Sequence, residues 1–159
     1  LRYSLSLDTG NMEEASRTRD SIEAKIGPDD PRVPSLNLMS RLSVGTEGEA
    51  FLYEAMEDAR LHIESTNDQF DRLRTIHMCL EASTEPPAWL VEAHSEFDHG
   101  ALNESMAHHR RALAHWWYWR GVVNRDERLS SWKEAIVRMR SSGSINAARG
   151  LTARLSREL

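Results

Sequence analysis

The sequence has a single cysteine, Cys79, so the chain cannot form an internal disulfide. A free thiol is normal in a reducing compartment, and we therefore expect a cytoplasmic protein. No apolar run approaches the ~20 residues that a helix needs to cross a bilayer, which argues against a membrane partner. Residues 1–7 also lack the basic start and continuous apolar core of a signal peptide. Because the chain does not begin with Met, we expect a processed product or a piece of a longer protein.

The short motifs that mark common active sites are also missing. No Gly-rich phosphate loop follows a strand, and no Ser or Cys stands in a recognisable nucleophile turn. Cys79 lies beside Leu80 in a helical pattern, which is more typical of a small core residue than of a nucleophile. The sequence therefore assigns no catalytic residue and no cofactor.

Helical periodicity, by contrast, runs through most of the 159 residues. We expect one all-α domain over residues 1–159, an irregular bundle of six or seven helices without a repeat. Alternating polarity at the start predicts an extended arm over residues 1–10, and three prolines predict an exposed loop at 27–34. The apolar stripes predict a buried core that contains Leu52, Met56, Leu73, Leu113, Trp116, Trp132, Ile136 and Leu155.

Capping patterns and turn residues predict where the helices begin and end. One helix or helix pair is expected from about residue 88 to 121, with a bend at Gly100. The turn at residues 141–144 precedes a last helix whose apolar line begins at Ile145. Helix starts are expected at the capping pairs Thr46 with Glu49, Thr66 with Gln69, and Asn124 with Glu127, the last beginning an apolar stripe at Leu129.

Charge is distributed unevenly along the chain. Residues 1–99 contain nine Lys/Arg and twenty Asp/Glu, whereas residues 100–159 contain eleven Lys/Arg and five Asp/Glu. Such a division suits head-to-tail contact between copies or a basic surface for a polyanion, unless the folded chain interleaves the two halves. Eighteen of the twenty basic residues are Arg, a side chain that binds carboxylate and phosphate in a bidentate manner.

The histidines of the chain raise the question of a metal site. Residues 96–99 match the Glu-x-x-His element of helical di-metal sites, but such a site needs a second element. Roughly 0.7 matches are expected by chance at this composition. A three-histidine site would instead combine His108 and His115, which share a helix face, with His62 or His94. Local hydrogen bonding explains these residues equally well, and we predict no bound metal.

Two segments fit the pattern Arg-x4-His, at Arg72 to His77 and at Arg110 to His115. The spacing resembles the signature of helical RNA-cleaving domains of the HEPN type. Roughly 0.8 matches for each spacing are expected by chance, so the sequence does not assign the family. A small metal-binding or RNA-cleaving bundle is therefore the third of our functional hypotheses.

Residues 116–119 are four consecutive aromatics and sweep most of a helical turn, so they cannot all face one core. Trp117 and Tyr118 are expected to face another helix, a partner or a stacked base. The turn before the last helix also has the length found in DNA-binding helix-turn-helix motifs, although a helical hairpin has the same pattern. The candidate partner or nucleic-acid contacts are Arg110, Arg111, Trp117, Tyr118, Arg120, Arg149, Arg154 and Arg157.

These features favour a non-catalytic structural or adaptor component of a macromolecular assembly. Its expected partners are copies of itself or other protein subunits, with Trp117 and Tyr118 as apolar anchors. The alternative is a nucleic-acid-associated helical module that uses the Arg-rich region after residue 100.

Overall fold

A computed structural model describes residues 17, 18, 20–22, 24, 25, 27 and 49–158. The predicted arm at 1–10, the loop at 27–34 apart from Gly27, and the predicted cap Thr46 lie outside the described residues. The chain divides into two compact units, residues 1–65 and 66–159. Each unit is described by itself.

Helix α4 (Glu49–Ser65) belongs to the first unit. The apolar stripe predicted for this segment is confirmed, because Met56, Ala59 and Ile63 are buried. Leu52 is half-buried, although the stripe predicted a core position for it. The opposite face of the helix carries its charged side chains, as expected for an amphipathic helix.

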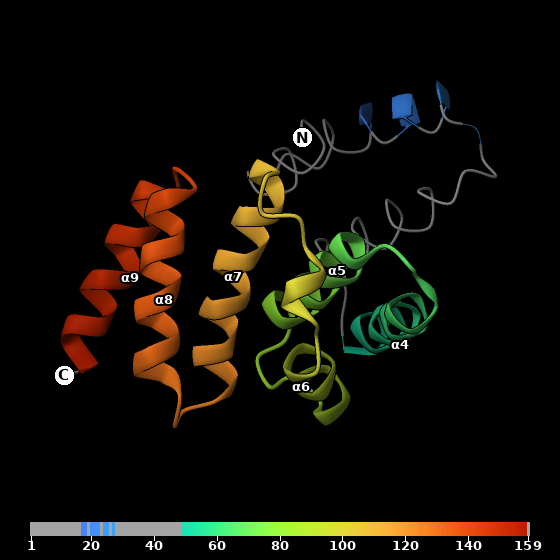
Figure 1. Cartoon of the computed structure of the whole chain (residues 1–159). Coiled ribbons are helices and arrows are strands. Elements are labelled where there is room, and N and C mark those ends of the chain that lie inside the picture. The colour runs from blue at the N-terminus through green and yellow to red at the C-terminus, as the bar shows by residue number, and fades with distance from the viewer. Residues whose placement is uncertain (1–16, 19, 23, 26, 28–48, 159) are drawn as a thin grey trace. The chain divides into compact units, whose positions relative to one another are not determined.

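The second unit contains α5 (Gln69–Ala82), α6 (Ala88–Ser95), the short 3-10 helix η1 (His99–Ala101), α7 (Ala107–Val123), α8 (Arg128–Ser141) and α9 (Ile145–Glu158). Helices α7, α8 and α9 lie side by side in this order, and α5 and α6 pack against α7 on its other side (Figure 1). The described residues include no strand. The prediction of an all-α irregular bundle is confirmed.

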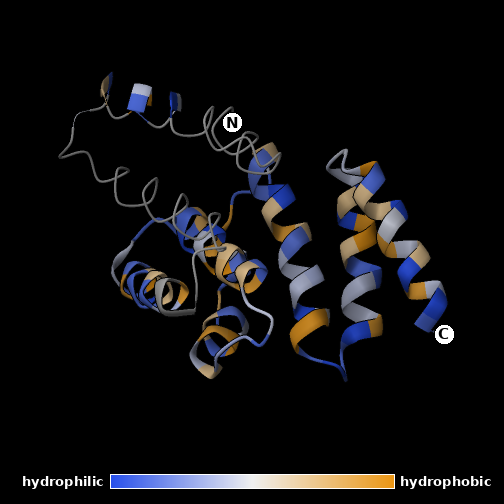
Figure 2. Ribbon diagram, turned by 180° about the vertical axis from the view of Figure 1, so that it is seen from behind, coloured by the Kyte–Doolittle hydropathy of each residue, from blue (hydrophilic) through white to orange (hydrophobic). Residues whose placement is uncertain are grey.

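The core of the second unit follows the predicted stripes. Figure 2 shows hydrophobic residues (orange) interspersed with hydrophilic ones (blue) along each of these helices. Of the eight predicted core residues, all but Leu52 are buried. Ala114, Trp132, Ala135, Ile136, Met139, Ala148, Leu151 and Leu155 form one cluster that joins α7, α8 and α9.

The turn between α8 and α9 explains why these helices form a hairpin. Gly143 adopts φ of +83°, a left-handed conformation that costs a side-chain-bearing residue energy. The Ser144 N–H donates to the Met139 carbonyl at 2.8 Å, and the Gly143 N–H donates to the Arg140 carbonyl at 3.2 Å. These two bonds are the Schellman arrangement that ends helices at glycine. The turn predicted at residues 141–144 is confirmed.

A second glycine sets the distance between α7 and α8. A Cβ atom at Gly121 would lie 2.6 Å from Nε1 of the Trp132 indole, which is fully buried. The indole therefore occupies the space that a side chain at position 121 would need. Its Nε1 donates a hydrogen bond to the Tyr118 carbonyl at 3.1 Å, which fixes the ring between the helices.

Two of the predicted helix starts are wrong. The N-cap of α5 is Asp68, whose carboxylate accepts from the N–H groups of Phe70 and Asp71 at 2.9 and 3.1 Å. Asp68 immediately precedes the first helical residue, Gln69, so its side chain can reach the free N–H groups of the first turn, whereas Thr66 lies two residues earlier. The Asn124 side chain accepts from the Asp126 N–H instead, so it stabilises the turn that precedes α8.

The other differences concern single elements. The segment expected from 88 to 121 is a pair of helices, α6 and α7, separated by η1, which contains Gly100. Leu129 and Ile145 lie in the first turns of α8 and α9 and are 42% and 43% exposed, although the stripes placed them in the core.

Candidate functional site

The four aromatics of α7 divide between two sides of the helix. Trp116 is 2% exposed, and its Nε1 donates to the His94 carbonyl of α6 at 3.1 Å. Trp117 and Tyr118 instead pack against the cluster shared with α8 and α9. The prediction that these two rings face another helix, a partner or a base is therefore met by neighbouring helices of the same unit.

Tyr118 is part of a stack that connects α7, α8 and α9. Its ring lies 6.2 Å from the Trp132 ring, with an interplanar angle of 10°. The Arg154 guanidinium lies 4.7 Å from the Trp132 ring centroid, and its Nη1 donates to the Tyr118 hydroxyl at 3.4 Å. A guanidinium over an indole face gains cation–π energy, so Arg154 is held close to α8.

Beside this stack the structure has a groove of about 330 Å³. Its floor and walls come mainly from α7, α8 and α9, and Glu81 from the end of α5 also reaches it. Met139 and Leu151 are buried, so the floor is apolar, while Arg154 provides a positive charge at one wall. The complete lining is Glu81, His115, Tyr118, Trp119, Met139, Ala147, Gly150, Leu151 and Arg154. We refer to it as the α9 groove.

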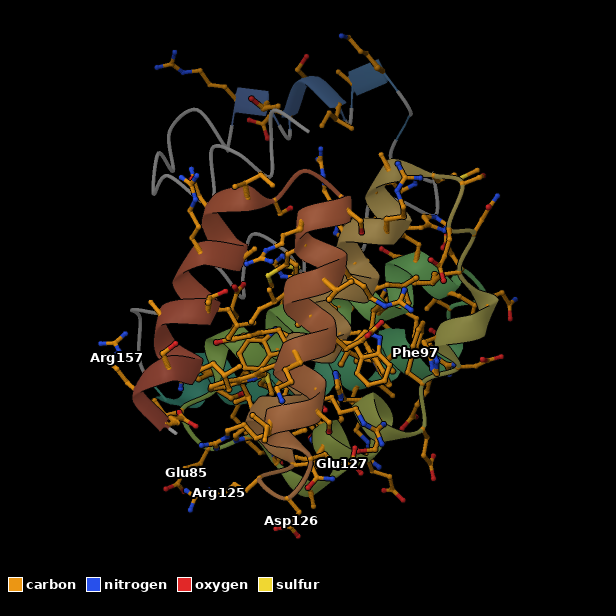
Figure 3. All side chains as sticks on the ribbon, turned by 60° about the vertical axis from the view of Figure 1, so that its left-hand side comes forward. Glu85, Phe97, Arg125, Asp126, Glu127 and Arg157 are labelled. Carbon is orange, nitrogen blue, oxygen red and sulfur yellow. The ribbon has the colours of Figure 1, made fainter. Side chains whose placement is uncertain are left out.

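Of the residues predicted to contact partners, Tyr118 and Arg154 are brought together at the α9 groove. Arg149 and Arg157 are exposed on the same helix as Arg154. Figure 3 shows Arg157 projecting outward from α9, and its Nε donates to the Ala153 carbonyl at 3.3 Å. One helix thus presents three arginines near an apolar depression.

The predicted arginines of α7 lie elsewhere. Arg110 donates from Nη1 to the carbonyls of Glu104 and Ser105 at 2.7 and 2.9 Å, so it fastens the loop before α7. Arg120 of α7 pairs with Glu127, which lies just before α8, and its guanidinium lies 5.2 Å from the Trp116 ring centroid. Arg111 is exposed at the first half of α7.

Of the nine residues that line the groove, only Tyr118 and Arg154 were predicted as contact residues; Trp119, Met139 and Gly150 are among the seven that were not. Met139 was expected only as part of a core stripe. Gly150 had a signal, since an isolated glycine inside a helical pattern costs about 1 kcal/mol relative to alanine. A Cβ atom at Gly150 would meet no atom within 4 Å, so the space beside it is open.

The histidines form two groups. His108 and His109 pack against Phe70, with ring centroids 4.8 and 5.0 Å away. His77 lies between His94 and His115, at centroid distances of 6.1 and 6.3 Å. The three-histidine site considered for a metal, His108 and His115 with His62 or His94, is not assembled. Within the described part of the chain, no three His, Cys, Asp or Glu side chains are arranged to hold a metal ion.

The Glu-x-x-His pattern at residues 96–99 does not lie on one helix face. Glu96 is the C-cap of α6, and His99 belongs to η1. The His99 ring stacks on Trp116 at 4.6 Å. Residues three apart share a face only within a continuous helix, so this spacing does not bring Glu96 and His99 together as two ligands on one helix face.

The buried histidine of α6 has a strongly altered titration. His94 is fully buried, and neither ring nitrogen has a hydrogen-bond partner among the described residues. Burial lowers the pKa of His94 from 6.5 to about 4, and the positive charge of Arg120 contributes to the lowering. Burial also lowers the pKa of His77 well below its ordinary value, reinforced by repulsion from His94 and His115. This interior therefore favours neutral imidazoles.

The two Arg-x4-His segments lie on α5 and α7, which pack together. Their histidines, His77 and His115, are neighbours, while Arg110 is bound to loop carbonyls. Nε2 of His77 is buried, and His115 alone of the two lines the α9 groove. The two histidines are therefore neighbours, but they do not line the same groove.

No protein-family model, curated protein or solved structure matches this chain. None of the helices in the described residues is long and apolar enough to span a membrane.

Proposed function

We propose that this chain is a structural component of a protein assembly and that copies of it associate head to tail through oppositely charged surfaces. Residues 128–158, which form α8 and α9, contain seven Lys/Arg and two Asp/Glu. Residues 66–99, which include α5 and α6, contain seven Asp/Glu and two Lys/Arg. These segments pack on different sides of α7 (Figure 1).

This separation is the observation that carries the proposal. If the acidic and basic segments interleaved, their fields would cancel and no polarity would remain. The helices that carry most of the acidic residues and those that carry most of the basic residues pack on different sides of α7, and this arrangement favours a polar distribution of charge in the second unit. A basic surface that meets an acidic surface on the next copy is a heterologous contact, which produces rings or filaments.

The nucleic-acid alternative receives less support. Several arginines of the basic region already have intramolecular partners. Arg128 pairs with Glu158 at 3.2 Å, and Arg138 pairs with Glu134 at 2.7 Å. Tyr118 and Trp132 stack on each other, which reduces the ring surface that could receive a base.

Sedimentation velocity of the full chain at low and high salt tests this function. We expect association at low salt that weakens as salt rises, because screening shortens the range of surface charges to ~10 Å at 0.1 M. A chain that stays monomeric at high concentration in low salt contradicts the proposal. Adding a mixed-sequence single-stranded RNA or DNA tests the alternative, which predicts strongly salt-dependent binding.

A further inference from the structure

We propose that the α9 groove receives the exposed face of helix α4 from a second copy of the chain. This inference rests on the proposed head-to-tail assembly. It keeps the α8–α9 side as the basic surface and assigns the acidic surface to α4, which lies outside residues 66–99. One surface is the groove formed by α7, α8 and α9. The other is the solvent-facing side of α4.

The groove is shaped for close approach by another helix. Ala147 and Gly150 lie one turn apart on its α9 wall, so the wall has little side-chain bulk. An interior helical glycine costs roughly 0.5–1 kcal/mol relative to alanine. At Gly150 a Cβ atom would meet nothing within 4 Å, so no contact within the described chain requires the glycine. Close contact with a partner provides a reason for it.

The floor of the groove supplies apolar contact area. Met139 and Leu151 lie beneath the opening and belong to the core cluster. Trp119 and Tyr118 are half-buried at its α7 wall. Large apolar side chains that enter this depression would bury both themselves and these aromatic rings, and such central anchors dominate the energy of interfaces.

The arginines of α9 outnumber its one acidic residue, Glu158, which pairs with Arg154 at 3.8 Å, and this balance favours an acidic partner. Arg154 lines the groove, and Arg149 and Arg157 are exposed on the same helix. Glu81 is the acidic residue of the lining and stands on the α5 side. A helix that lies along α9 and carries carboxylates beside its apolar residues would therefore be complementary to this wall.

Helix α4 has these properties on its exposed face. Tyr53 is 68% exposed and Leu61 is 63% exposed, the two largest exposures among the described large hydrophobic residues. They are eight residues apart with Glu57 midway, so all three follow one line along the helix. The basic residue of α4, Arg60, is paired with Glu64 at 3.1 Å. Additional carboxylates on this face come from Glu54 and Asp58.

A second copy is the occupant because every chain carries both surfaces. The α4 face of one copy would enter the groove of the next, and the α4 of that copy would remain available for a third. The two surfaces are different, so the contact is heterologous and generates a chain of subunits, not a closed symmetric dimer.

Two variants, each of which blocks one of the two surfaces, test the contact, and we call them the capping variants. Tyr53→Ser with Leu61→Ser removes the inserted side chains, and Gly150→Trp fills the groove. Both sites are open, since the first two residues are exposed and Gly150 has no neighbour at its Cβ. Val137→Ser removes a 60% exposed apolar residue of α8 that does not line the groove, and it is the matched control. Circular dichroism and thermal melting verify the fold of each variant.

The full chain and the variants are compared by sedimentation velocity. We expect each capping variant alone to lose at least tenfold in association constant, and the Val137→Ser control to associate like the unaltered chain. A 1:1 mixture of the two capping variants should form a dimer and nothing larger, because the mixture has one intact pair of surfaces.

Each contrary outcome separates the two proposals. An unaltered chain that stays monomeric overturns the head-to-tail assembly. Unaltered association of folded capping variants overturns only the groove contact and leaves assembly in place. A photo-crosslinker at position 61, in a mixture of isotope-labelled and unlabelled chains, should join α4 to α9 of different chains. Crosslinks confined to single chains overturn the second copy as occupant.

Discussion

Replacing His94 by Phe should remove much of the acid sensitivity of this fold. The imidazole is fully buried between α6 and α7, with its ring 5.5 Å from that of Trp116. Neither ring nitrogen has a hydrogen-bond partner among the described residues. Phenylalanine keeps the stacking and removes both unsatisfied polar atoms. Replacing unsatisfied polar groups by apolar groups of similar shape is nearly neutral or stabilising.

The expected magnitude follows from the pKa of His94. Burial lowers this pKa from 6.5 to about 4, so the unfolded chain binds the proton more tightly than the folded chain does. The free energy of unfolding must therefore fall as the pH falls from 6.5 toward 4. Over the whole window the loss from this residue is about 3 kcal/mol, and by pH 5 it is about 2 kcal/mol. Above pH 6.5 the residue contributes no pH dependence.

Urea unfolding at pH 7.5 and pH 5, followed by tryptophan fluorescence and circular dichroism, measures the difference. Both proteins should lose stability at acid pH, but His94→Phe should lose about 2 kcal/mol less. His94→Leu is a second variant that cannot titrate, and it should show the same change in pH dependence even if a cavity lowers its absolute stability. Equal pH dependence in all three proteins would refute the assignment of a buried neutral imidazole.

Further predictions concern packing and reactivity. Gly121→Ala should lower the free energy of unfolding by about 1–3 kcal/mol in urea titrations, because the added Cβ collides with a buried indole. The same change at Gly150 should raise it by about 0.5–1 kcal/mol, and a loss there would contradict the open space. Trp132→Ala should cost about 3–5 kcal/mol, and a cost below 1 would contradict its core position. Burial raises the pKa of Cys79 to about 12, so the native thiol should react slowly with a disulfide reagent and quickly in denaturant.

The core could be predicted from sequence because burial follows helical periodicity. Trp116, Trp132 and Leu155 each lie in a line of apolar residues at three- and four-residue spacing, and all are buried. Leu129 and Ile145 continue the same lines and are exposed. Periodicity identifies the apolar face of a helix but not how far the neighbouring helices extend along it, and the first turns of α8 and α9 show this difference.

Helix starts were less predictable because several residues compete for the same N–H groups. At α5 the sequence offers both Thr66 and Asp68, and the capping-box pattern selects the former. In the structure the Asp68 carboxylate binds two N–H groups, and the Thr66 hydroxyl accepts from the Asp68 N–H at 3.3 Å. Thr66 therefore holds the backbone of Asp68, and Asp68 caps the helix. The pattern located the correct region but placed the cap two residues too early.

The α9 groove could not be predicted from the sequence, because it forms where the surfaces of several packed helices leave a gap. Its residues come from α7, α8 and α9, with Glu81 from α5, and each helix alone shows only an ordinary apolar stripe with charged flanks. Tyr118 and Arg154 were predicted as contact residues for different reasons, and only the hairpin turn at Gly143 brings their helices together. The local signal was Gly150, a helix-weakening residue without a local role. A glycine of this kind marks a place where the helix surface has little bulk, but the neighbouring helices are needed to show that this place lines a groove.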